Sequence, residues 1–411
     1  MFPVASLLTT VLLALSTAAS PVEIRSPLIT LPFARSLSTR DGTVNLLQHD
    51  QVRATALRDR GNAIAAGRLD RRQSNMPITT FEAAGYIAAV GVGSPATTYN
   101  LIVDTGSSNT WVGAGTPYKV TNTSVDTGEP VYVPYGSGSF SGTEYTDTVT
   151  LGSLTITKQS IGVASTSTDF SGVDGVLGIG PEDLTLGSLT NEPSTEIPTV
   201  TQNLSTEGKI PAEIVGVSFE PSTTTSSMNG ELTFGGIDTS KYNGVLNYTP
   251  LTTTSPASYY WGINESITYG WTTILSTTAG IVDTGTTLIL IATDAFNQYQ
   301  SLTGAVSDSA IGMLRITTSQ YNALQNLYFS INGVTYTLTP NGQIWPRSLN
   351  TYIGGSSSYV YLIVNDIGSN SGSGLDFVNG KGFLERFYSV FDTTNSRVGL
   401  ATTSYTYAII N

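Results

Sequence analysis

The chain has 411 residues, a net charge of −12 and no cysteine, and its only histidine is His49. These counts exclude disulfides, thiol nucleophiles, iron–sulfur clusters and zinc–thiolate sites. An acidic chain does not attract nucleic acid through phosphate contacts. Carboxylate chemistry therefore remains the main candidate for acid–base catalysis, with no metal or cofactor expected.

Residues 1–20 are typical of a secretory signal peptide. The apolar run Val4–Leu15 is followed by small residues up to Ser20, although a basic start is missing. The run is too short to span a bilayer, and no apolar run of about 18 residues follows it. We expect a secreted, extracellular protein without membrane association.

Residues 21–72 differ in charge from the rest of the chain. They hold nine basic and five acidic residues, a net charge of +4, whereas residues 73–411 hold nine and 25, a net charge of −16. The pattern predicts a helix over Val44–Ala66, with one face formed by Leu46, Leu47, Val52, Ala56 and Leu57. The dibasic pair Arg71-Arg72 predicts cleavage near Gln73. The mature protein would then lack histidine, which excludes Ser-His-Asp chemistry and histidine metal sites.

From Ala84 onward, short runs rich in Val, Ile, Thr and Tyr alternate with turn residues, which predicts an all-β protein. The expected strands are Tyr86–Val92, Tyr99–Val103, Thr143–Leu151, Leu154–Ala164, Glu231–Phe234 and Leu327–Leu338. The few expected helices are Thr199–Leu204, Thr293–Leu302 and Thr318–Leu327.

An internal repeat divides this body into two halves. Leu101–Ser108 contains Asp104-Thr105-Gly106, and Gly280–Thr287 contains Asp283-Thr284-Gly285 after an offset of 179 residues. A fainter repeat relates Asp174–Gly180 to Asp376–Gly382. Two motifs in the same order indicate a duplication. We expect two similar β domains, residues 73–244 and 245–411.

The repeated aspartates are the candidate reactive groups. Each follows three apolar strand residues, where an ionised carboxylate needs hydrogen bonds. The residues that follow can supply those bonds through the hydroxyls of Thr105, Ser107, Thr284 and Thr286 and the close backbone approach at Gly106 and Gly285. If the halves are related by a twofold axis, Asp104 and Asp283 meet and share one proton. A lone Asp-Thr-Gly is more often an ordinary turn, but two copies favour a pair of aspartates that act together.

These motifs resemble the pepsin-like aspartic proteases over residues 80–411, and within them the secreted basidiomycete enzymes of the polyporopepsin type. The resemblance implies a bilobal, pepsin-like fold of two β-barrels with pseudo-twofold symmetry and a substrate cleft between the lobes. It implies an endopeptidase that acts on proteins and peptides at acid pH, works as a monomer and is inhibited by pepstatin-type compounds. Asp104 and Asp283 would be the catalytic dyad. The hydroxyls of Ser107 and Thr286 would support the two aspartates, and those of Thr105 and Thr284 would hydrogen-bond across the interface between the domains.

The resemblance also assigns a flap. Tyr135 would close over the substrate, Gly136 and Ser137 would give backbone contacts, and Trp111 would hydrogen-bond the tyrosine. Val176 would lie near the main specificity pocket. Because Ser137 stands where some fungal relatives carry an acid, we expect preference for large apolar residues around the cut and poor acceptance of lysine there.

The basic segment 21–72 would act as an inhibitory propeptide. In many members of the family a lysine of the propeptide contacts the two aspartates. This segment contains no lysine, so one of the arginines from Arg53 to Arg72 would have to take that place. The chain also differs from the usual family pattern at Lys381, a basic residue near the second repeated segment. The sequence leaves the effect of Lys381 open. N-glycosylation sequons occur at Asn122, Asn203, Asn247 and Asn264.

Two other functions fit parts of the sequence. One is a catalytically silent protein of the same fold that binds or inhibits other proteins. The other is a glycosidase with paired carboxylates, although its acids are not expected as twin Asp-Thr-Gly motifs. The intact motifs and Tyr135 favour the protease.

Overall fold

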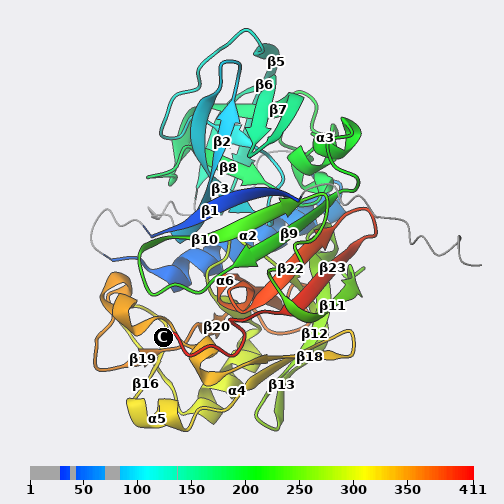
Figure 1. Ribbon diagram of the computed structural model, residues 1–411. Coiled ribbons are helices and arrows are strands. Elements are labelled where there is room, and N and C mark those ends of the chain that lie inside the picture. The colour runs from blue at the N-terminus through cyan, green and yellow to red at the C-terminus, as the bar shows by residue number, and fades with distance from the viewer. Residues whose placement is uncertain (1–27, 38–42, 70–83, 137) are drawn as a thin grey trace, which may run out of the picture.

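The computed structural model describes residues 28–37, 43–69, 84–136 and 138–411 (Figure 1). The predicted signal peptide, the predicted cleavage near Gln73 and the flap residue Ser137 lie outside these ranges. No helix in the described ranges is long and apolar enough to cross a membrane.

Strands dominate the described residues, which confirms the all-β prediction. In the first half they are β1 (Ile29–Leu37), β2 (Ala84–Val92), β3 (Thr97–Asp104), β4 (Trp111–Val112), β5 (Val125–Pro134), β6 (Ser139–Leu151), β7 (Leu154–Thr168), β8 (Gly175–Gly178), β9 (Ile214–Phe219) and β10 (Ser226–Phe234). In the second half they are β11 (Asn243–Pro250), β12 (Gly262–Tyr269), β13 (Thr272–Val282), β14 (Ile289–Ile291), β15 (Val306–Ser307), β16 (Leu314–Ile316), β17 (Leu327–Ile331), β18 (Val334–Leu338), β19 (Val360–Tyr361), β20 (Val364–Asp366), β21 (Phe377–Asn379), β22 (Phe387–Asp392) and β23 (Arg397–Thr402).

Helices are short apart from one. The described α-helices are α2 (Leu46–Ala65), α3 (Val200–Thr206), α4 (Thr293–Thr303), α5 (Thr318–Asn322) and α6 (Lys381–Leu384). Short 3-10 helices cover Glu182–Thr185, Ala257–Tyr259, Pro340–Gln343 and Arg347–Ile353. The helix expected over Thr318–Leu327 is wrong in its second half, because Leu327 begins β17 with its side chain in the core.

The run Leu327–Leu338, expected as one strand, is a hairpin. Strands β17 and β18 pair antiparallel, and Asn332 and Gly333 between them have φ angles of 46° and 80°. An Asn-Gly pair tolerates two positive φ angles, which is what a two-residue hairpin turn requires. The sequence therefore contained the turn signal that the prediction missed.

The strands form two lobes joined by a large shared sheet (Figure 1). Among the described residues, this sheet has the order β11-β23-β22-β9-β10-β1-β2-β3-β8-β4-β7-β6-β5, and the second lobe adds a sheet in the order β18-β17-β12-β13-β21-β14-β20. The C-terminal strand β22 pairs with β9 of the first half. The predicted domain boundary between residues 244 and 245 falls inside β11. The boundary is therefore not a linker between two separate domains.

The internal repeat has the same topology in both lobes. Strand β3 ends at Asp104 and pairs in parallel with β8, while β13 ends directly before Asp283 and pairs in parallel with β21. Each aspartate therefore stands at the end of a buried strand beside the second repeated segment. Asp104 and Asp283 are 2% and 0% exposed.

Strand β1 was not anticipated, since the expected strands began after residue 84. It lies in the middle of the shared sheet, between β10 and β2, with Leu31 opposite Leu232 and Phe33 opposite Ala88. Leu31 and Phe33 are buried. Part of the basic segment 21–72 is therefore built into the sheet of the folded chain.

The predicted helix is present as α2, but its buried face differs from the one expected. Leu46 and Leu57 are buried as predicted, whereas Leu47, Val52 and Ala56 are only partly buried. The other residues buried on this face are Asp50, Arg53, Ala54 and Gly61. The reason is that α2 lies between the two lobes (Figure 1), where it meets polar groups as well as apolar ones.

Candidate active site

Each repeated aspartate is held by the residues that follow it. The Gly106 N–H donates to Asp104 Oδ1 at 3.0 Å, and the Ser107 hydroxyl donates to Oδ2 at 2.5 Å. In the other lobe, the Gly285 N–H donates to Asp283 Oδ1 at 2.9 Å, and the Thr286 hydroxyl donates to Oδ2 at 2.5 Å. The two carboxylates thus have matching partners, which favours their ionised forms despite burial.

The two loops interlock across the lobe interface. The Thr105 N–H donates to Thr284 Oγ1 and the Thr284 N–H donates to Thr105 Oγ1, both at 2.9 Å. The Thr284 hydroxyl in turn donates to the carbonyl of Val103 at 3.0 Å. Since all these groups are buried, the reciprocal bonds fix the position of one loop relative to the other.

The glycines allow the two carboxylates to approach. A Cβ on Gly106 would lie 2.7 Å from Asp283 Oδ1, and one on Gly285 would lie 2.6 Å from Asp104 Oδ1. Both distances are too short for any real side chain. Glycine is therefore required at both positions by proximity to the aspartate of the opposite lobe.

Arg53 of α2 bridges the two aspartates. Its Nη2 donates to Asp104 Oδ1 at 2.6 Å and to Asp283 Oδ1 at 2.9 Å, and its Nε donates to Asp283 Oδ2 at 2.8 Å. One nitrogen thus contacts both carboxylates, and Asp283 receives the two-pronged contact that suits a guanidinium group. Among the described arginines from Arg53 onward in this segment, this is the one that reaches the pair.

The site makes the two aspartates unequal as acids. Burial raises the pKa of Asp104, and the charge of Asp283 raises it further, so that the opposing effect of Arg53 is outweighed. Burial also acts to raise the pKa of Asp283, but Arg53, Thr286 and Gly285 outweigh burial and leave that pKa below its usual value. Asp283 is therefore the stronger acid, and Asp104 is the carboxyl that takes up a proton first.

The same contacts act on the arginine. Burial acts to lower the pKa of Arg53, but the negative charges of Asp104 and Asp283 and their hydrogen bonds raise it above its ordinary value. Arg53 therefore stays charged in the cleft.

The predicted flap residues lie over this site. The Trp111 ring N–H donates to the Tyr135 hydroxyl at 2.9 Å. Val176 packs in the apolar cluster that contains Trp111 and that Tyr135 covers. Trp111, Tyr135 and Val176 are thus brought together near Asp104, and Ser137 is outside the described residues.

Helix α2 occupies the space beneath the flap. A Cβ on Gly136 would lie 3.0 Å from Ala56 Cβ and 3.1 Å from the Val52 carbonyl. Arg60 donates to the carbonyls of Leu184 and Leu186 in the first lobe.

The second lobe holds α2 as well. The Tyr260 hydroxyl donates to the Leu57 carbonyl at 2.7 Å, and Arg58 donates to the Ser369 hydroxyl at 2.7 Å. The helix is therefore clamped by both lobes and by the flap.

Asp50, which the sequence pattern did not single out, is also part of this clamp. Asp50 is fully buried, and its Oδ2 accepts from the N–H groups of Thr287 and Leu288 at 3.0 and 2.7 Å. Its other oxygen contacts His49 Nδ1 at 2.9 Å. A signal was present, because Asp50 and Arg53 share the helix face that carries Leu46 and Leu57, where charged residues are unexpected.

The four sequons differ in their surroundings. Asn122 and Asn264 are exposed, whereas the side-chain amides of Asn203 and Asn247 donate to Gln159 Oε1 and to the Val245 carbonyl.

No group of three or more candidate metal ligands occurs in the part of the chain that the structure describes.

Comparison with known proteins places this site in a family. Residues 85–403 match the eukaryotic aspartyl protease family. The chain therefore belongs to this family and is an aspartic endopeptidase.

Individual relatives agree with this assignment. The chain is 66% identical to polyporopepsin of Irpex lacteus over 333 residues, which cover 81% of this chain and 98% of that protein. It is 30% identical to pepsin A of Sus scrofa over 353 residues, covering 79% and 83% of the two chains. The crystal structure of aspartic proteinase from Irpex lacteus superposes with a TM-score of 0.80 at 57% identity, covering 93% of this chain and all of that one. The fold prediction is confirmed, and a catalytically silent binding protein is not favoured.

Proposed function

We propose that Asp104 and Asp283 are the catalytic dyad of a secreted endopeptidase that acts at acid pH. We further propose that the described chain is its inactive precursor, in which residues 21–72 are an inhibitory propeptide. The observation that carries the proposal is the bridge by Arg53, whose guanidinium contacts both buried carboxylates at 2.6 to 2.9 Å.

Once Arg53 leaves, the same two carboxylates can activate water. Two carboxylates held this close cannot both stay ionised cheaply, so they share one proton, as is general for the dyad of aspartic proteases. A water between them would lose a proton to the ionised member while it attacks a peptide carbonyl, and the protonated member would donate to the developing oxyanion.

Transfer of the proton completes the reaction. The base passes its proton to the amide nitrogen as the carbon–nitrogen bond breaks, and the other member takes back a proton from a hydroxyl of the tetrahedral intermediate, which leaves a carboxylic acid product and restores the singly protonated dyad. Tyr135 would close over the peptide, with Gly136 and Ser137 giving backbone contacts and Val176 lining the pocket for an apolar side chain. Preference for large apolar residues at the cut and poor acceptance of lysine remain predictions.

Inhibition follows from where α2 lies. Its residues Val52 and Ala56 fill the space below Gly136, so a substrate cannot enter while the helix is in place. The match to the family begins at residue 85, after β1 and α2, which supports a role for these two elements outside the catalytic unit. Acidification would protonate the dyad and weaken its attraction for Arg53.

The predicted maturation scheme has a signal peptide at residues 1–20, cleavage near Gln73 and a monomeric mature enzyme of two lobes, residues 73–244 and 245–411. Asn122 and Asn264 are the sequons we expect to carry glycans, because their side chains are exposed in the folded chain.

The test is hydrolysis of denatured haemoglobin from about pH 2 to about pH 8, with and without pepstatin. The wild-type chain is compared with Asp104→Asn after processing near Gln73 has been checked by N-terminal sequencing. We expect activity only at acid pH, and we expect it to vanish with pepstatin and in the variant. Undiminished activity of folded Asp104→Asn would refute the assignment of the dyad.

A further inference from the structure

A buried polar pair lies beside the strand that leads into Asp283. Glu265 of β12 and Asn379 of β21 are both 0% exposed, and the Asn379 amide donates from Nδ2 to Glu265 Oε2 at 2.7 Å. The other oxygen of each group, Glu265 Oε1 and Asn379 Oδ1, has no hydrogen bond in the part of the chain that the structure describes. Buried acceptors without donors are costly, so an ionised Glu265 would leave this pair poorly satisfied.

A proton on Glu265 would satisfy both of these oxygens. A protonated carboxyl group has one O–H donor, whereas an ionised one only accepts. With the proton on Oε1, Glu265 can donate to Asn379 Oδ1 while Oε2 keeps the bond from Nδ2. The acid and the amide then face each other through two hydrogen bonds, and neither of the two acceptors remains unpaired.

The surroundings of Glu265 favour this neutral form. Burial raises the pKa of Glu265 to about 8, against the opposing effect of the amide hydrogen bond. The neighbouring elements 257–259 and β17 carry the titratable groups Tyr259 and Tyr328, while Asp283 follows β13 and Asp376 precedes β21. None of these four groups is among the effects that shift the pKa of Glu265.

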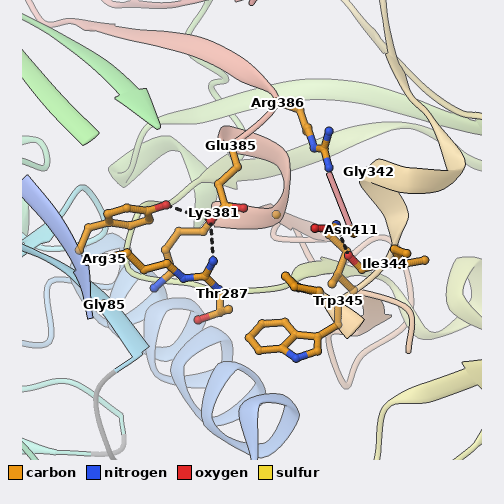
Figure 2. A pocket seen from close by; sticks show the side chains of 14 residues that line it. Arg35, Gly85, Thr287, Gly342, Ile344, Trp345, Lys381, Glu385, Arg386 and Asn411 are labelled. Atoms are coloured by element: carbon orange, nitrogen blue, oxygen red, sulfur yellow. Dashed lines mark hydrogen bonds and ion pairs between the residues drawn. The ribbon is translucent and has the colours of Figure 1, made fainter. Parts of the chain in front are cut away.

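The charged groups beyond β21 belong to a separate cavity. Lys381 and Glu385, on the segment after β21, line this cavity together with Arg35 of β1 (Figure 2). Glu265 and Asn379 are not part of its lining, and none of the three charges shifts the pKa of Glu265. Glu265 is therefore a neutral acid at the acid pH at which we propose that the enzyme acts.

The internal repeat shows that the fold does not need this polar pair. The strand register and the offset of 179 residues place Val90 and Leu177 of the first lobe at the positions of Glu265 and Asn379. Val90 and Leu177 are both 0% exposed. The first lobe thus fills the same two positions with apolar side chains, and the polar pair distinguishes the second lobe from the first.

Asn379 connects the pair to Asp283. It is the last residue of β21, which runs parallel to β13 with Asn379 opposite Val282. Its backbone carbonyl accepts from the Asp283 N–H at 3.2 Å. Because the amide and this carbonyl belong to one residue, a displacement of the amide moves the acceptor that holds the backbone of Asp283.

We propose that Glu265 is a positioning residue for the reaction, which in its protonated form pairs with Asn379 through two hydrogen bonds and so fixes the backbone of Asp283. Glu265 acts through Asn379 and does not touch the substrate. This inference rests on the proposed function, because it requires that Asp283 is a member of the catalytic dyad.

The test compares kcat and KM of the processed wild type and variants on a fluorogenic peptide at about pH 4. Glu265→Gln should keep kcat within about twofold of the wild type, because the glutamine amide offers the same donor and acceptor as the protonated acid. Glu265→Val leaves the Asn379 amide buried without its partner. We expect kcat of this variant to fall about tenfold, while KM changes by less than about twofold.

A double variant tests whether the two residues act as a pair. Glu265→Val combined with Asn379→Leu copies the apolar residues of the first lobe, Val90 and Leu177. Since no polar side chain of the pair is then left without a partner, kcat should return to within about threefold of the wild type. A double variant as impaired as Glu265→Val would contradict the pairing.

The matched control is Glu144→Val in the first lobe. Glu144 of β6 is also buried, with one hydrogen bond from the Ser160 hydroxyl at 2.6 Å and a second oxygen that has no partner in the described residues. Strand β6 does not lead into either aspartate of the dyad. Glu144→Val should therefore keep the wild-type kcat even if it unfolds more easily.

Infrared spectroscopy tests the proton itself. At about pH 6.5 exposed carboxyl groups are ionised, since the reference pKa values of Asp and Glu are about 3.9 and about 4.3. The folded wild type should retain a carboxylic acid C=O band that is missing from the spectrum of Glu265→Gln. This measurement does not depend on peptide cleavage, so its result is independent of the proposed function.

The possible results are distinct. Wild-type kcat in folded Glu265→Val would overturn the positioning role, as would an equal loss of kcat in Glu265→Gln and Glu265→Val. Identical infrared spectra for the wild type and Glu265→Gln would overturn the protonated pair. If Glu265→Val fails to fold, Glu265→Asp serves instead. Its carboxyl group is one methylene short of the amide, so kcat should fall about threefold, and an unchanged kcat would overturn the proposal. Failure of the processed wild type to cut any peptide would refute the proposed function and the positioning role with it, even if the infrared band is present.

Discussion

Replacement of Arg53 by methionine should release the inhibition that we propose for the precursor. The substitution keeps an unbranched apolar stem in helix α2 but removes the guanidinium that contacts Asp104 and Asp283. The matched control is Arg58→Met on the same helix, because Arg58 donates to a neutral group, the Ser369 hydroxyl at 2.7 Å.

The size of the effect of Arg53→Met follows from the burial of the ion pair that Arg53 forms with the aspartates. Removing one partner of a buried ion pair costs about 3–5 kcal/mol, because the remaining charge is left uncompensated. The low end applies here, since Asp104 has a raised pKa and can take up a proton in place of the lost cation. About 3 kcal/mol corresponds to a change of about 100-fold in the balance between the closed and open precursor. The Arg58 control should change this balance by less than about tenfold.

The effect has a defined pH window. Because the pKa of Asp283 is lowered, its ion pair with Arg53 stabilises the closed precursor above the ordinary Asp pKa of about 3.9 and is lost as pH falls through the lowered value. Asp104, with its raised pKa, is protonated earlier in the same descent. The difference between the wild type and Arg53→Met should therefore be largest at about pH 5 to 6 and should shrink toward about pH 2.

The assay is the initial rate on a short fluorogenic peptide, measured before any conversion is visible on a gel. At about pH 5.5 unprocessed Arg53→Met should show much higher activity than the unprocessed wild type, and Arg58→Met should resemble the wild type. Equal rates for the two variants would refute the reasoning, because the helix would then inhibit by steric blockage alone.

Three other changes test the site and the fold. Asp104→Asn should lower kcat by at least about 10³-fold while the unfolding temperature stays near that of the wild type, and a loss of folding instead would count against a catalytic role. Thr284→Val leaves the Thr105 N–H buried without its acceptor, so chemical unfolding should show a loss of about 1–3 kcal/mol, and an unchanged midpoint would contradict the interlock. Glu265 is fully buried and hydrogen-bonded by the Asn379 amide, and burial raises its pKa to about 8. Its contribution to stability is complete below its ordinary pKa and is lost as pH rises toward about 8, so unfolding followed from about pH 5 to 8 should show a decline that Glu265→Gln reduces. An identical decline in both proteins would show that other groups cause it.

Local patterns in the sequence were enough for the class of fold and for the candidate dyad. Alternation of apolar and polar residues, turn residues and the helical period act over a few positions, so strands such as Tyr99–Val103 and the helix over Leu46–Ala65 could be predicted. The two Asp-Thr-Gly motifs carry their own hydrogen-bond partners within three residues, which is why the support of Asp104 and Asp283 could be read from the sequence.

The features that could not be predicted depend on contacts between distant segments. Arg53 and Asp283 are 230 positions apart, and no local pattern distinguishes Arg53 from the arginines after it. Strand β1 was missed because it finds its partners in β10 and β2, far along the chain. The unequal pKa values of the dyad and the site that holds Asp50 exist only where both lobes and α2 meet. Local sequence thus specifies the elements and the reactive groups, whereas burial and charge at the junction of the lobes set how those groups are held.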